Sequence, residues 1–250
     1  MTADRAKQAG FSQRIRLEWM ELAAQLVDQG RTRVEIEMEL QQALSQRLSI
    51  GSSAVRGNRG KVITILLRSW VTPPAEVVPL RDDAVEYLHA LPSSTHVVLH
   101  WGLAMASYPF FGRVADLAGR QLQLQGRVVA AQVQRRVREQ LGERETVARA
   151  ARRVLRSFAD WGVLQDSDVT GVYQGREGIL VRDSAVGAWL LEALMLADRS
   201  YARPLSSLRD AAALFPFTLE RLTPATISGN ARLESFRQGM AEEMVALRGG

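Results

Sequence analysis

The clearest chemical pattern in this chain is a set of four arginines spaced at i, i+3, i+4 and i+7. They are Arg149, Arg152, Arg153 and Arg156. On a helix of 3.6 residues per turn this spacing gathers four guanidinium groups into one line, called here the arginine stripe. A guanidinium is a planar, charged donor that binds phosphate, or the O6 and N7 atoms of guanine, through paired hydrogen bonds. The spacing therefore predicts an anion-binding face.

Positive charge is concentrated around this stripe. The 250-residue chain has a net charge of +5, while the stretch from Arg127 to Arg156 alone holds nine arginines against three glutamates. A concentrated basic surface raises the local potential and attracts phosphate. We expect Arg135 and Arg136, which precede the stripe, to contact phosphates with Arg153 and Arg156. Arg149 and Arg152 are expected to reach base edges.

The stripe requires a helix, and the pattern predicts one from Glu145 to Asp160. Its opposite face is apolar at helical spacing. A helix expected over 127–141 is joined to it by Gly142-Glu143-Arg144, a short glycine-containing turn typical of a helix-turn-helix. After Trp161 the pattern changes to that of strands, and we predict a short hairpin with its tip at residues 175–178. Arg176 would then lie at a basic wing tip, within reach of the minor groove.

An arginine-faced helix followed by a small hairpin is the layout of a winged helix-turn-helix, and double-stranded DNA is the commonest partner of that fold. The five tryptophans fall on apolar faces and none lies within the stripe, which favours duplex over single strands. The alternative is a solvated face paired with Glu145 at i, i+4. Both interpretations remain open from the sequence.

The N-terminal part predicts a second helix-turn-helix-type unit. Helices are expected from Ser12 to about Asp28 and from Thr32 to about Leu48. The element from Ala54 to Trp70 is either a helix or a buried strand, because two glycines weaken its helical pattern. Three basic residues lie near its start and are further DNA-binding candidates: Arg56, Arg59 and Lys61.

The predicted fold is mainly α, with two helix-turn-helix-type units of which the second is winged. Three prolines between Val71 and Pro79 mark the best boundary. We expect an N-terminal helical domain over residues 1–72, a helical domain over 80–183 that ends in the winged unit, and a C-terminal helical extension over 184–250. In that extension Ser184 is expected to cap a helix. The segment from Arg232 to Leu247 is either a helix or a pair of short strands.

Catalysis, metals and cofactors are not expected. The chain has no cysteine, so thiolate metal sites are excluded. His96 and His100 have the i, i+4 spacing of a metal-binding pair, but they lack an adjacent glutamate and a third ligand, which favours a role at a helix–helix contact. The segment Gly57-Asn58-Arg59-Gly60-Lys61 lacks the first glycine and the final Ser or Thr of a phosphate-binding loop.

The sequence also predicts a cytoplasmic protein. Residues 1–10 are polar and charged and do not resemble a signal peptide. No apolar run approaches the length of about 18 residues that a membrane-spanning helix needs. No membrane partner is expected, and the oligomeric state is left open.

Three stretches of the chain together resemble a known family. They are residues 53–61, Tyr108-Pro109-Phe110-Phe111, and residues 152–164. In order and spacing they are similar to the BrxA proteins of bacterial BREX phage-defence systems, over roughly Phe11 to Asp183. The resemblance implies a mainly helical, non-catalytic protein with helix-turn-helix-type domains. It also implies binding to double-stranded DNA and association with other defence-system proteins. An alternative is a helical scaffold that binds protein partners, which an exposed apolar surface after Ala185 would favour.

Overall fold

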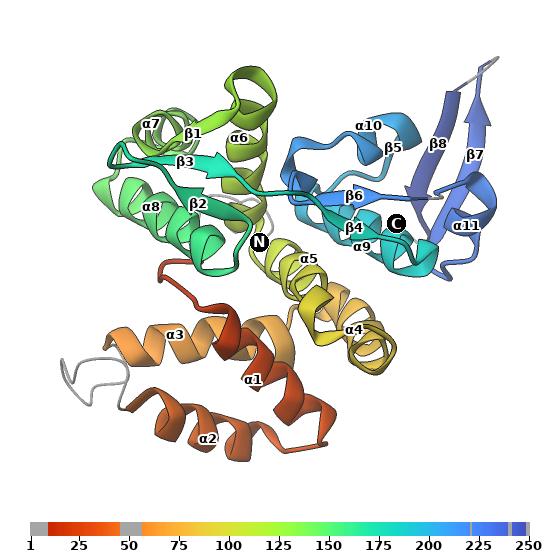
Figure 1. Ribbon diagram of the computed structural model, residues 1–250. Helices are drawn as coiled ribbons and strands as arrows, with labels where there is room; N and C mark the ends of the chain where they lie inside the picture. The colour runs from red at the N-terminus through yellow and green to blue at the C-terminus, as the bar shows by residue number, and fades with distance from the viewer. Residues whose placement is uncertain (1–9, 46–56, 221, 240–241, 249–250) are drawn as a thin grey trace.

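The computed structural model describes residues 10–45, 57–220, 222–239 and 242–248, and these residues form a mainly helical protein with small sheets (Figure 1). At its centre lies α5 (Val97–Ser107), in which every residue is buried. The sequence of α5 is apolar around its whole circumference, which suits a helix enclosed by others. Helix α9 (Ser184–Asp198) packs against it, because Gly102 leaves room for the ring of Trp189.

The N-terminal part contains α1 (Leu17–Asp28), α2 (Arg33–Ser45) and α3 (Asn58–Leu66), and the last of these continues through a π-helical turn, η2 (Leu67–Val71). The predicted third element is therefore a helix and not a strand. Thr32 and Glu35 exchange capping hydrogen bonds at the start of α2, as expected for a capping box. The first helix begins at Leu17 rather than Ser12, because residues 10–16 are not helical and pack against α8. Arg56 lies outside the described residues.

Pro73, Pro74 and Pro79, which follow α3 in the chain, lie at or near the starts of the next helices. They lead through η3 (Ala75–Val77) into α4 (Val78–Ala90), where Pro79 stands in the first turn. A short turn, η4 (Ser93–Thr95), then precedes α5. Next comes α6 (Pro109–Gln125), which ends at Gly126 in the left-handed conformation.

The arginine-rich part follows in the order β1 (Arg127–Val129), α7 (Ala130–Leu141), α8 (Glu145–Asp160), β2 (Leu164–Asp166) and β3 (Val172–Gly175). The three strands form an antiparallel sheet in the order β1-β3-β2. Residues 127–129, expected to begin a helix, are a strand because they pair with β3. The α7–α8 turn is as predicted, and Gly142 adopts a φ of +104° that favours glycine.

The predicted position of the hairpin tip is wrong. The turn between β2 and β3 consists of Ser167 to Gly171, so Arg176 lies after the hairpin and not at its tip. Gly171 supplies a positive φ of +79°, which makes this nearer turn possible. The apolar strand β4 (Ile179–Val181) does not return to β3. It pairs in parallel with β6 (Phe217–Leu219), where its side chains gain burial.

The C-terminal part is not only helical. After α9 come β5 (Ala202–Pro204), α10 (Leu205–Arg209), η5 (Ala212–Leu214), β6, α11 (Pro224–Ser228), β7 (Leu233–Gln238) and β8 (Glu242–Leu247). Strands β5, β8 and β7 form an antiparallel sheet, so the last segment is a pair of strands. The cap of α9 is Asp183, whose carboxylate accepts from the N–H of Ala185 at 2.8 Å, and not Ser184.

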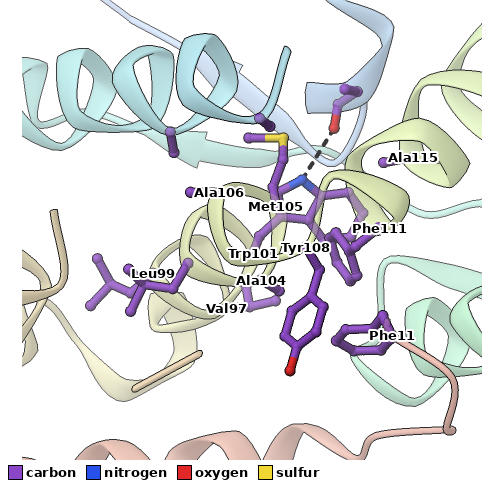
Figure 2. Close-up of a cluster of buried hydrophobic side chains, with 14 of the residues drawn as sticks. Phe11, Val97, Leu99, Trp101, Ala104, Met105, Ala106, Tyr108, Phe111 and Ala115 are labelled. Atoms are coloured by element: carbon purple, nitrogen blue, oxygen red, sulfur yellow. Dashed lines mark hydrogen bonds between the residues drawn. The ribbon is translucent and has the colours of Figure 1, made fainter. Parts of the chain in front are cut away.

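One buried cluster joins all three predicted parts of the chain. Trp101 of α5 lies at its centre, with ring centroids 4.6 Å from Phe158 of α8 and 5.4 Å from Phe215 near η5. Its indole N–H donates to the carbonyl of Ala213 at 3.1 Å. Figure 2 shows Phe11 beside Tyr108, with Trp101 and Phe111 close to them. The cluster extends across both predicted domain limits. These limits remain predictions.

Candidate nucleic-acid interface

Helix α8 has the two faces that its sequence predicts. The buried face consists of Val147, Ala150, Ala151, Val154, Leu155, Ser157 and Phe158. All four arginines of the stripe lie on the other side, where none is fully buried. The four nevertheless differ in their surroundings, and the stripe divides into two halves.

The first half of the stripe is open to solvent. Arg149 is 47% exposed and pairs with Glu145 at 2.6 Å, while Glu145 itself is 83% exposed. The hydrogen bond from Arg149 lowers the pKa of Glu145. Arg152 is exposed and forms no ion pair within the described part of the chain. A pair so exposed to water contributes little to stability, so both guanidinium groups are accessible to a ligand.

The second half of the stripe is engaged inside the molecule. Arg153 donates a hydrogen bond of 2.6 Å to the backbone carbonyl of Ser12, and burial lowers its pKa. Arg156 pairs with Asp166 of β2, and its guanidinium lies 5.8 Å from the ring centroid of Tyr173 on β3. Arg156 thus holds the hairpin against α8. The interactions of these two arginines are structural.

The N-terminal segment, residues 10–16, lies over this second half. The N–H of Ile15 donates to the hydroxyl of Ser157 at 2.8 Å, and the indole N–H of Trp161 donates to the carbonyl of Ile15 at 2.9 Å. Arg14 forms an ion pair with Asp160. The N-terminal segment and the second half of α8 therefore form one packed unit, which leaves Arg149 and Arg152 as the open part of the stripe.

Arg135 and Arg136 lie on α7 and share one carboxylate, that of Glu139, at 3.5 and 3.1 Å. With Leu124 and other residues of α6 they line a groove between α6 and α7. They are not part of the arginine stripe. Their assignment to DNA phosphates remains a prediction.

The remaining sequence candidates lie apart from the stripe. Arg176 is exposed in the loop after β3 and lines a cavity with Arg209 of α10. Arg59 is half-buried and Lys61 is exposed at the start of α3. In Figure 1, α3 and α8 begin on the same side of the molecule. Arg56 cannot be placed, since it lies outside the described residues.

The actual hairpin tip is not basic. It contains Asp168 and Val169, and the latter side chain is 63% exposed. The sequence pattern did not reveal Ser12, Asp166 and Tyr173 as partners of the stripe. Ser12 and Tyr173 were found only through contacts distant in sequence, but Asp166, ten residues after Arg156, could have been suspected as a nearby carboxylate.

The two histidines are engaged at a helix–helix contact. Both histidines form hydrogen bonds with the carboxylate of Glu21 on α1. One carboxylate oxygen lies 3.0 Å from His96 Nδ1, and the other lies 2.9 Å from His100 Nε2. The hydrogen bond from His100 and that from His96 lower the pKa of Glu21 to about 2. Among the described residues, no cluster of three or more His, Cys, Asp or Glu side chains is placed to hold a metal ion.

Comparisons of the chain with family models, with curated proteins and with solved structures gave no match. In the part of the chain that the structure describes, no helix combines the length and apolar character needed to cross a membrane.

Proposed function

We propose that this protein binds double-stranded DNA through the open half of the arginine stripe and serves as a non-catalytic, cytoplasmic component of a bacterial BREX-like phage-defence system. The observation that carries the proposal is the exposure of Arg149 and Arg152 on the first half of an otherwise well-packed helix. These guanidinium groups stand two turns or less from the start of α8, where a recognition helix meets base edges.

The order of elements supports a winged helix-turn-helix. Such a unit consists of three helices and a three-stranded antiparallel sheet, with the second and third helices joined by a short turn. Helices α6, α7 and α8 match the three helices. Strands β1, β2 and β3, in the sheet order β1-β3-β2, match the sheet. The turn from Ser167 to Gly171 takes the place of the wing.

The proposal assigns different roles to the parts of this unit. Arg149 and Arg152 contact bases or the adjacent phosphates. Arg153 and Arg156 position the surface through Ser12 and Asp166. The acidic tip at Asp168 makes the wing a poor ligand for phosphate, so α8 supplies most of the affinity. Lys61 and Arg59, on the same side of the molecule, are a second point of contact.

The test is a titration of fluorescent duplex DNA, at two salt concentrations, with wild-type protein and the double variant Arg149→Glu/Arg152→Glu. Both side chains are exposed, so the fold should persist. We expect the affinity to fall by at least about tenfold, since several phosphate or base contacts at 1–3 kcal/mol each are lost. The salt dependence of wild-type binding should be steep, and that of the variant shallower.

A matched control is Arg209→Glu/Arg237→Glu. Both arginines are exposed on the C-terminal part, away from α8 in Figure 1, and the substitutions lower the net charge by the same amount. Wild-type-like affinity in the control is the expected result. An equal loss of DNA affinity in both double variants would show that only the net charge of the protein matters. Binding of wild-type protein that does not depend on salt would refute the proposal.

A second candidate function is that of a scaffold or adaptor for protein partners. The C-terminal helix α9 does not favour it, because this helix is almost wholly buried. Exposed apolar side chains elsewhere, including Met38 and Leu124, do favour it. Co-purification of partner proteins after nuclease treatment would distinguish this function from DNA binding.

A further inference from the structure

Helix α2 exposes an apolar ridge that packs against nothing within the described residues. Val34 and Met38, one turn apart, are 67% and 66% exposed, while Ile36 and Leu40 on the opposite face are buried. Charged residues flank the ridge: α2 carries three glutamates against one arginine. Glu37 and Glu39 have no ion-pair partner in the described part of the chain. The ridge is thus apolar along its crest and acidic beside it.

The groove between α6 and α7 has the opposite character. It encloses about 370 Å³, and Leu117 and Leu124 supply its apolar part. The side chain of Leu124 is 87% exposed, an unusual position for a leucine on an otherwise well-packed helix. Three arginines line the groove: Arg120, Arg135 and Arg136.

These three arginines carry an excess of positive charge. Arg120 pairs with Asp116 at 2.9 Å, whereas Arg135 and Arg136 must share Glu139. Two carboxylates therefore face three guanidinium groups, and both α7 arginines remain about 60% exposed. A partner that brings carboxylates beside an apolar crest would satisfy both the charge and the leucines.

We propose that the ridge of one copy of this protein docks into the α6–α7 groove of a second copy. The chain itself presents both complementary surfaces, each with an exposed aliphatic centre and charges of opposite sign around it. Within one molecule they cannot meet, because α2 and α7 lie at opposite ends of the fold (Figure 1). The contact is consequently heterologous: every copy offers one ridge and one groove, so copies join head to tail.

The geometry of the contact places Met38 beside Leu124, with Glu37 or Glu39 near Arg135 and Arg136. Burial of the aliphatic side chains supplies most of the affinity, and the ion pairs select the orientation. The contact does not use Arg149 or Arg152, so its failure and the failure of the proposed DNA binding through α8 can be told apart. It assigns Arg135 and Arg136 to a protein partner in place of the DNA phosphates expected from the sequence.

The experiment is sedimentation velocity of the full chain, without DNA, from low micromolar to several hundred micromolar concentration. Wild-type protein should form dimers and longer species as the concentration rises. Met38→Asp removes the ridge but leaves the groove, and Leu124→Asp does the reverse. Because both side chains are mostly exposed, each variant should fold, which circular dichroism and urea unfolding will check. Each variant alone should remain monomeric.

The decisive arm mixes the two variants. The ridge of Leu124→Asp can enter the groove of Met38→Asp, and the resulting pair cannot grow further, so the mixture should contain 1:1 dimers and no longer species. Arg182→Asp, on an exposed residue outside both surfaces, serves as the control and should associate like wild type. Wild-type protein that stays monomeric at every concentration would overturn the proposal. Single variants that associate normally, or a mixture that stays monomeric, would overturn it too.

If Met38→Asp or Leu124→Asp proves unfolded, a reversal of one proposed ion pair is tested in its place. Arg136→Glu should weaken association of the wild type several-fold, and adding Glu37→Arg to the same chain should restore it, because the pair is then reversed in every contact. Failure of the second substitution to restore association would overturn the proposal.

Discussion

Arg153 of α8 donates a hydrogen bond of 2.6 Å to the backbone carbonyl of Ser12, which lies 141 residues earlier in the chain. This bond joins the second half of the arginine stripe to the N-terminal segment. It turns an arginine that was expected to bind phosphate into one that positions the surface around it. Its neighbour Arg152, only one residue away, remains open to solvent.

The two adjacent arginines should therefore separate stability from DNA binding. Arg153→Ala should lower the free energy of unfolding by about 1–2 kcal/mol, because a charge-assisted hydrogen bond to a half-buried carbonyl is lost. Arg152→Ala should change it by less than about 0.5 kcal/mol and weaken duplex binding more. Urea unfolding and a binding titration on both variants will check this, and equal behaviour of the two in both assays would contradict it.

The Trp161 indole N–H should control access to the N-terminal segment. Trp161→Phe keeps an aromatic ring in the core but removes the bond to the Ile15 carbonyl, which costs about 1 kcal/mol. Cleavage by trypsin after Arg14 or Arg16 should become several-fold faster. Trp19→Phe is the control, because the Trp19 N–H is buried without a partner among the described atoms. Faster cleavage in the control alone would disprove the assignment.

Two glycines of α6 should respond very differently to substitution by alanine. A Cβ at Gly119 would stand 1.9 Å from the backbone carbonyl oxygen of Ala212, which cannot rotate away. Gly119→Ala should cost at least about 2 kcal/mol of stability. At Gly112 the nearest atom belongs to the flexible side chain of Met105, at 3.0 Å. Gly112→Ala should be near neutral, because alanine favours a helix by about 1 kcal/mol over glycine. Thermal unfolding of both variants measures the difference.

Glu21 should make the protein sensitive to acid. Hydrogen bonds from His100 and His96 lower its pKa from 4.5 to about 2 in the folded state. A depressed carboxyl pKa gives stability that is fully present above the unfolded pKa and is lost as the pH falls through the folded one. Glu21→Gln should therefore be less stable than wild type by about 2 kcal/mol above pH 5, with the difference shrinking between about pH 5 and pH 2. Urea unfolding at a series of pH values tests this. A difference that does not change with pH would show that the carboxylate is not responsible.

Local pattern predicted α8 well because its information is local. The apolar spacing from Val147 to Phe158 matches one face of a helix, and the predicted limits agree with those of the structure. The same holds for the turn at Gly142. Glycine and proline set these boundaries through their own backbone preferences, which do not depend on distant residues.

Strand pairing could not be read in this way. Residues 127–129 have the pattern of a helix start, but they form a strand because they pair with β3. The hairpin tip is the turn from Ser167 to Gly171 and not the segment around Arg176, because β4 pairs with β6 instead of returning to β3. A three-residue strand has too few side chains for its sequence pattern to predict which strand it pairs with. Its place depends on which distant strand offers free hydrogen-bonding groups and burial.

By itself, the sequence determined that this protein is mainly helical and that four arginines share one face of α8, since helical periodicity and composition are properties of neighbouring residues. Only the tertiary structure decided which of those arginines are open. Arg153 and Arg156 are engaged by Ser12 and Asp166, and no spacing rule reports that a backbone carbonyl from a distant segment will lie beside a given guanidinium. The physical reason is that packing brings together groups whose order in the chain carries no record of their distance in space.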